Sequence, residues 1–251
     1  MAIKTRKISD WLSANGQAVT NASKATMEDA IRTDIGQLYD GVFIMFHRKS
    51  DNYPLAVRVS SWASYQTGGE IAEGVLLVEG GKHLVIAPTE ASSAKWSSKP
   101  VSSSDTSGSV QISGVTTTSD RIAALNDFAG RANTTAIING STSSNVTNTE
   151  DYAAGFCNRY SRTNANGKGL TAGRWWLPSN GEMAMIWANF DKINYALSKI
   201  NGATQLQTTW YWTSTQYSAT TAWTLYLGGG GVYLDYKFGQ DRVRPVSAFL
   251  Y

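Results

Sequence analysis

Residues 210–249 read WYWTSTQYSATTAWTLYLGGGGVYLDYKFGQDRVRPVSAF. Aromatic and apolar residues alternate here with small polar ones, and this period of two is typical of β-strands that bury one face. The glycine run Gly228–Gly231 predicts a turn between two of these strands. No nucleophile–base pair and no cluster of metal ligands lies in the stretch, so it is typical of a contact surface.

The alternation assigns a face to each residue of the last two strands, because successive side chains of a strand point to opposite sides. In residues 222–227 we expect Trp223, Leu225 and Leu227 on one face and Thr224 and Tyr226 on the other. In residues 232–238 the two sets are Val232, Leu234, Tyr236 and Phe238, and Tyr233, Asp235 and Lys237. We expect the apolar set of each strand in the core. An ordinary sheet with a polar outer face explains this pattern as well as a binding surface does.

Upstream, four short apolar runs predict further strands at residues 42–46, 55–59, 74–78 and 83–87. The glycine pair Gly80-Gly81 separates the last two runs and predicts a hairpin.

Helices are expected at four places. Ser179 and Glu182 form a capping box at the start of a helix that runs through Met183, Trp187, Ile193, Leu197 and Ile200 to Asn201-Gly202. A second helix begins at Ser119-Asp120, with Ile122, Leu125 and Ala129 on one face, and a third carries Tyr152, Phe156 and Tyr160. Residues 1–40 predict an N-terminal helical segment through Met27, Ile31, Ile35 and Leu38. Residues 97–119, rich in serine and threonine, are expected to be a long loop outside the core, and residues 139–150 a second polar loop.

Composition excludes several classes of function. The net charge of +3 is small and evenly spread, so we expect no nucleic-acid partner. No stretch reaches the roughly 20 apolar residues of a membrane span, and the first residues lack the apolar core of a Sec signal peptide. The single cysteine, Cys157, is expected to be a buried free thiol.

No catalytic or metal centre is predicted. His47 and His83 lack cysteine partners, Glu182 is explained by helix capping, and the glycine run lacks the Lys-Ser/Thr of a phosphate-binding loop. Asp235 and Asp241 are a candidate carboxylate pair, but nothing in the sequence indicates that either is desolvated. We therefore expect no enzymatic activity and no cofactor.

Several motifs in order carry a resemblance to a known family: RWWLPSNGE at residues 174–182, YWTSTQY at 211–217, Ala222-Trp223, the glycine-rich turn, and VRPVSAF at 243–249. Together they resemble the Fibrobacter-type major paralogous domain and, more narrowly, the variable proteins of diversity-generating retroelements, especially those of gut phages. The resemblance covers about residues 70–251. It implies an α+β protein with a C-type-lectin fold of the formylglycine-generating-enzyme type, spanning residues 41–251.

The resemblance also implies candidate ligand-binding positions. In that family a reverse transcriptase randomises the adenines of a template repeat, so template asparagine codons become variable positions near the C-terminus. In this chain the corresponding positions within residues 210–249 are Thr221, Thr224, Tyr226, Gly228, Gly229, Gly231, Tyr233, Leu234, Asp235, Tyr236, Phe238, Gly239, Gln240 and Asp241. If both adenines of an asparagine codon are substituted and its pyrimidine third base is kept, the new codon can specify every one of these residues except Gln240. Trp223, Leu225, Val232 and residues 242–249 are expected to stay fixed, and of the four glycines only Gly230 is expected to be required by the turn.

These observations predict a retroelement-diversified receptor-binding protein, an adhesin of a phage tail fibre that binds a protein or glycan of the host cell surface. The expected location is the virion or the outside of a cell, and analogy with phage fibres suggests a homotrimer. Formylglycine chemistry and calcium binding are not carried over, since Cys157 lies outside any matching motif and no acidic cluster is present. The alternative is a bacterial surface protein of the same fold that binds glycan or protein without diversification.

Overall fold

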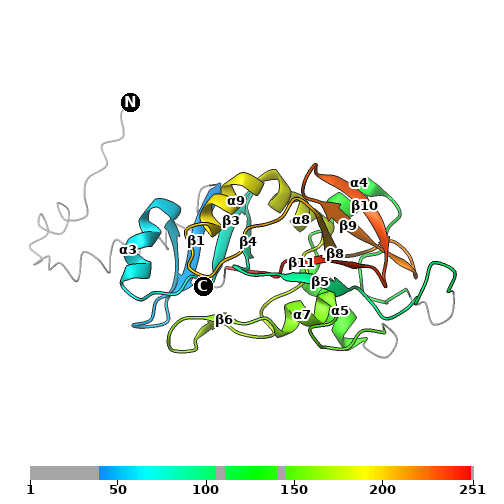
Figure 1. Ribbon diagram of the computed structural model, residues 1–251, viewed down its shortest axis with the longest axis horizontal. Coiled ribbons are helices and arrows are strands. Elements are labelled where there is room, and N and C mark those ends of the chain that lie inside the picture. Colours follow the sequence, from blue (N-terminus) through cyan, green and yellow to red (C-terminus); the bar gives the residue numbers. More distant parts are fainter. Residues whose placement is uncertain (1–39, 106–110, 141–144, 250–251) are drawn as a thin grey trace, which may run out of the picture. The chain divides into compact units, whose positions relative to one another are not determined.

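Two five-stranded sheets form the framework of the domain (Figure 1). The computed structural model describes residues 40–105, 111–140 and 145–249. The predicted N-terminal helix, like the proposed role of residues 1–40 in attachment, lies outside these residues. The described part is mixed α+β, with more strand than helix, and this confirms the coarse fold class.

The first sheet has the strand order β12-β4-β3-β1-β2 and is antiparallel throughout. Its strands are β1 (Gly41–His47), β2 (Pro54–Arg58), β3 (Gly74–Glu79), β4 (Lys82–Ile86) and β12 (Val246–Ser247). The four predicted apolar runs are therefore strands, each within one residue of its expected bounds. Gly80 and Gly81 have φ values of 55° and 76° between Glu79 and Lys82, which confirms the two-residue hairpin.

The second sheet has the order β10-β9-β8-β11-β5. It consists of β5 (Ala91–Lys95), β8 (Trp210–Gln216), β9 (Thr221–Tyr226), β10 (Gly231–Tyr236) and β11 (Gln240–Val243). β11 runs parallel to β8 and antiparallel to β5. The sequence did not predict β5, because its residues ASSAK carry no apolar alternation. A short pair, β6 (Arg162–Thr163) and β7 (Gly169–Leu170), forms a separate two-stranded sheet.

Short helices pack on the sheets, with α9 on one side of the domain and α5 and α7 on the other (Figure 1). The helical elements are η1 (Val59–Ser61), α3 (Trp62–Thr67), α4 (Arg121–Leu125), α5 (Gly130–Asn139), α7 (Ala153–Arg159), α8 (Asn180–Ala188) and α9 (Phe190–Leu197). No helix among the described residues is long and apolar enough to cross a membrane.

The helix predictions are confirmed in part. The capping box of Ser179 and Glu182 is present, and burial of Glu182 raises its pKa to about 7. The single predicted helix after it is wrong, because the chain breaks at Asn189 into α8 and α9. Asp120 caps α4 by accepting the backbone N–H of Ala123, but α4 ends at Leu125. Ile122, expected on a buried face, is 72% exposed.

Two cores hold these elements together. The larger lies between the first sheet, α8, α9 and one face of the second sheet, and it includes Ile44, Leu77, Ile186 and Leu225. The smaller lies on the opposite face of the second sheet, against α5 and α7, and it includes Trp96, Trp212 and the free thiol of Cys157. Ile112 and Val115 also belong to this second core, so the prediction that all of residues 97–119 lie outside the core is wrong.

Candidate ligand-binding face

The C-terminal stretch forms the outer half of the second sheet. β10 pairs with β9, with Tyr226 opposite Gly231, Thr224 opposite Tyr233 and Thr221 opposite Tyr236. β9 pairs in turn with β8, where Trp210 lies opposite Tyr226. β10 ends the strand order, so among the described residues one of its edges pairs with no strand.

Three aromatic side chains gather on one face of these strands. Opposed residues of an antiparallel pair share a face, so Trp210, Tyr226 and Tyr233 lie together. The ring centroid of Trp210 lies 5.0 Å from that of Tyr226 and 4.6 Å from that of Tyr233, whose plane is nearly perpendicular to it. Tyr233 is 50% exposed. We call these three residues the aromatic cluster; two are candidate positions, and Trp210 is not.

Asp235 and Asp241 lie beside the aromatic cluster and form an acidic pair. Asp235 follows Tyr233 by two residues and so shares its face, and Oδ2 of Asp241 lies 3.1 Å from the hydroxyl of Thr224, the residue opposite Tyr233. Burial raises the pKa of both carboxyls. That of Asp241 rises to about 6, because burial is reinforced by the negative charge of Asp235. The sequence alone did not indicate this desolvation.

The opposite face of β10 is exposed where the sequence predicted core. Leu234 and Tyr236 are 42% and 39% exposed, whereas Val232 is buried in the larger core. The cause is that β10 is the edge strand and the core reaches only its first residues. Phe238 is half-buried, and its ring stacks on Tyr236 at a centroid distance of 5.4 Å. Candidate positions on both faces of β10 are thus accessible.

Thr224 and Lys237 depart most from the expected pattern. Both were placed on the polar outer face, yet each is only 1% exposed. Lys237 lies over the ring of Trp96 at 4.6 Å, and its Nζ donates to Oε1 of Gln216. Burial lowers the pKa of Lys237 to about 7. The smaller core covers this end of the face, so only the end around Tyr226 and Tyr233 meets solvent.

The four glycines of the turn differ in backbone conformation and in the space around them. Gly230 has a φ of 70°, a left-handed conformation that favours glycine, and a Cβ there would overlap the Trp187 ring. Gly228, Gly229 and Gly231 have no such φ. A Cβ on Gly229 would meet a single atom within 4 Å, on the Tyr226 ring at 3.8 Å, whereas a Cβ on Gly228 or on Gly231 would overlap the ring of Tyr226 or of Tyr233 and require that side chain to move. Gly228 and Gly229 are exposed.

The remaining candidate positions lie toward the other end of these strands. Thr221 is half-buried, with its hydroxyl 2.8 Å from that of Ser218. Gly239 closes the turn after β10 by donating its N–H to the Tyr236 carbonyl. Gln240 accepts a hydrogen bond from Ser93 and lines a polar hollow of about 430 Å³ with Ser93, Ala94, Lys95, Glu150, Asp151 and Tyr152.

A buried ion-pair network behind the sheet was not predicted. Glu90 accepts hydrogen bonds from Arg242 at 2.8 Å, from Arg244 at 2.6 Å and from the Tyr211 hydroxyl at 2.7 Å. Arg244 is fully buried and also donates to the Ala87 carbonyl. These contacts anchor Arg242, in β11, and Arg244, which follows that strand.

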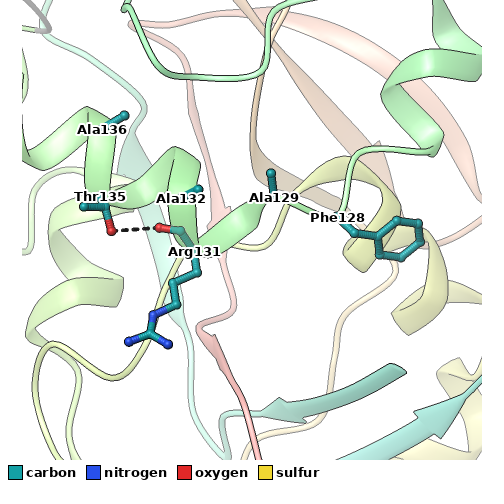
Figure 2. A pocket seen from close by; sticks show the side chains of 6 residues that line it. All are labelled: Phe128, Ala129, Arg131, Ala132, Thr135 and Ala136. Carbon is teal, nitrogen blue, oxygen red and sulfur yellow. Dashed lines mark hydrogen bonds between the residues drawn. The ribbon is translucent and has the colours of Figure 1, made fainter. Parts of the chain in front are cut away.

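Other surface features do not join the candidate positions. An open hollow of about 590 Å³ lies along α5 between Phe128 and Ala136. Figure 2 shows the side chains that line it and the hydrogen bond from Thr135 to the Arg131 carbonyl. His47 lies 2.9 Å from the buried Glu73. Within the described ranges, no group of three or more histidine, cysteine, aspartate or glutamate side chains is arranged to hold a metal ion.

Comparisons with known proteins give distant structural likeness only. No family model matches the sequence, and no curated protein matches it. Among solved structures, the domain is similar to a fimbrial protein from Bacteroides ovatus ATCC 8483, with 19% identity and a TM-score of 0.44. The match covers 66% of this chain and 36% of the fimbrial protein, about a third of its length. At this TM-score the likeness assigns neither a fold family nor a function.

Proposed function

We propose that this chain is a non-enzymatic receptor-binding protein whose residues 210–249 are diversified by a retroelement. The domain would have the C-type-lectin fold of the formylglycine-generating-enzyme type, and it would act as an adhesin of a phage tail fibre. Its partner would be a protein or glycan of the host cell surface, bound outside the cell. Several copies on one fibre would raise a weak affinity per site through avidity.

One observation carries the proposal: the candidate positions and the scaffold positions separate in space although they alternate in sequence. Trp223, Leu225 and Val232 are buried, while Tyr233, Leu234 and Tyr236 next to them are exposed. Such a sheet tolerates substitution at the exposed positions because core packing rests on the others. Thr224 is the exception, since it is buried and hydrogen-bonded.

The DNA downstream of this coding sequence tests the proposal. We expect an imperfect repeat of codons 210–249, differing only where the repeat has adenine, beside a reverse transcriptase gene. The repeat should carry asparagine codons at the exposed positions of β10. A downstream region with neither repeat nor reverse transcriptase would exclude diversification and favour the alternative, a non-diversified surface protein that binds glycan or protein.

A second experiment separates binding from catalysis. Replacement of Tyr233 and Tyr236 by alanine should abolish attachment of the purified protein to host cells while leaving the fold intact. Turnover of any substrate that disappears on replacement of Glu182, Asp235 or Asp241 would contradict the non-enzymatic assignment.

A further inference from the structure

The exposed end of the candidate face has a definite electrostatic character. Asp235 and Asp241 supply two carboxylates beside the aromatic cluster, and neither forms an ion pair with any residue in the described part of the chain. The neighbouring cations are engaged elsewhere: Lys237 bonds to Gln216 in the smaller core, and Arg242 pairs with Glu90 behind the sheet. The accessible charge on this face is therefore negative.

This charge discriminates between classes of ligand. Both carboxyls are already partly desolvated, and any ligand that covers them removes more of their water. A neutral ligand leaves that cost uncompensated, whereas a cationic group offsets it with a charge-assisted hydrogen bond. The rings of Trp210, Tyr226 and Tyr233 favour the same choice, because ammonium and guanidinium groups are attracted to aromatic faces.

The edge of β10 adds a second feature. A strand at the end of a sheet leaves backbone N–H and C=O groups directed outward, and an extended polypeptide can pair with them. β10 ends the order of the second sheet, and Tyr233 and Asp235 lie on this strand. A peptide aligned along it would place every second side chain on the face that holds the acidic pair.

We propose that the ligand of this face is an extended segment of a partner protein, with a lysine or arginine side chain bound between the aromatic cluster and the acidic pair. The inference rests on the proposed function, since it takes residues 210–249 as the ligand-binding surface. The inference narrows the class of partner: the proposed function allows a protein or a glycan, and the charge of this face favours a basic segment of a protein. Trp210 is not among the candidate variable positions, whereas Tyr226, Tyr233, Asp235 and Asp241 are, so diversification would change this specificity from one variant of the protein to another.

Two capped peptides test the inference by titration calorimetry at low ionic strength. One has five residues with lysine at its second and fourth positions and threonine elsewhere; the other has glutamine in place of lysine. We expect the lysine peptide to bind about tenfold more tightly, a ratio that corresponds to one well-placed charge interaction. Raising the salt concentration should reduce this ratio, because part of the attraction is screened.

Matched variants assign the effect to the acidic pair. Asp235→Asn and Asp241→Asn should each reduce the preference for lysine, and the double variant should abolish it. Asp191→Asn is the control, because it removes the same charge from an exposed residue of α9 outside the face; its preference should equal that of the wild type. Near-ultraviolet circular dichroism checks that each variant is folded.

Three results would overturn the inference: equal affinity for the two peptides, binding of neither peptide, or a lysine preference that survives in the double variant. None of these three results contradicts the proposed function if the protein still attaches to host cells and that attachment is lost when Tyr233 is replaced. Conversely, absence of a downstream repeat would remove diversification without affecting a measured lysine preference.

Discussion

The hydroxyl of Thr224 lies 3.1 Å from Oδ2 of Asp241, and this contact links β9 to β11 across the intervening strand β8. The same hydroxyl lies 2.8 Å from the backbone carbonyl of Tyr211. Thr224 is therefore a candidate position whose side chain belongs to the interior of the sheet. Its single hydroxyl proton is shared between these two acceptors, and the contact with Asp241 positions one member of the acidic pair.

Thr224→Val should destabilise the domain, because valine keeps the shape of threonine and removes the hydroxyl. We expect the free energy of unfolding to fall by about 1–3 kcal/mol, the cost of leaving a buried polar partner unsatisfied. Urea denaturation measures it. Thr221→Val is the matched control at a half-buried position and should cost less. Equal costs would show that Thr224 is as tolerant as an ordinary variable position.

Leu234 and Leu225 provide a direct test of the division between variable and scaffold positions. Leu225 is fully buried in the larger core, whereas Leu234 is 42% exposed on the edge strand. Leu225→Ala should lower the free energy of unfolding by about 2–5 kcal/mol, as cavity-forming substitutions do. Leu234→Ala should lower it by less than about 1 kcal/mol. Thermal unfolding of the two variants gives the comparison, and similar losses would contradict the assignment of faces.

The elements that could be predicted from the sequence are those whose residue types are determined by burial or by local backbone conformation. β1, β3 and β4 are apolar runs because the cores cover them, and Gly80-Gly81 specifies its hairpin by local conformation. β5 could not be predicted because most of its side chains are small and polar. Its partners in the sheet, Gln240 and Asp241, also lie about 150 residues away in the sequence. The pattern of residues within a short segment does not indicate a pairing with so distant a partner.

The candidate site was predictable in its location but less so in its detail. Alternation of apolar and polar residues shows which side chains of a strand share a face. It does not show at which residue of the strand the core stops covering that face. The exposure of Leu234 and the burial of Lys237 both follow from that boundary, which depends on tertiary packing around β10 and Trp96. The sequence identified Asp235 and Asp241 as a candidate carboxylate pair but did not indicate their desolvation, for the same reason, since that desolvation arises only when β10 and β11 meet.

Gly230 and Gly229 differ in what a side chain would cost. Gly230→Ala places a Cβ against the Trp187 ring and keeps a left-handed φ, so we expect a loss of about 1–3 kcal/mol in the free energy of unfolding. Gly229→Ala meets neither obstacle and should change that free energy by less than about 1 kcal/mol in either direction. Chemical denaturation of both variants checks the prediction. Equal tolerance at Gly230 would mean that the turn rearranges freely and that all four glycines are open to diversification.

Lys237 should make the stability of the domain depend on pH in a defined direction. Burial lowers its pKa in the folded state from 10.5 to about 7. Between these two values the unfolded chain binds more protons than the folded one, so the free energy of unfolding rises with pH across this window. Below about pH 7 both states are protonated at Lys237, and the cost of burying the charge is fully present.

Lys237→Met removes this dependence while filling a similar volume over Trp96. We expect the difference in the free energy of unfolding, wild type minus variant, to increase by about 1 kcal/mol per pH unit from pH 7 to pH 9. Urea denaturation at several pH values measures this difference. Lys168→Met, at an exposed position outside the sheet, is the control and should give a difference that stays constant over the same range. A constant difference for Lys237→Met as well would show that this lysine keeps its charge in the folded protein, and that the covered end of the face is wetter than its burial indicates.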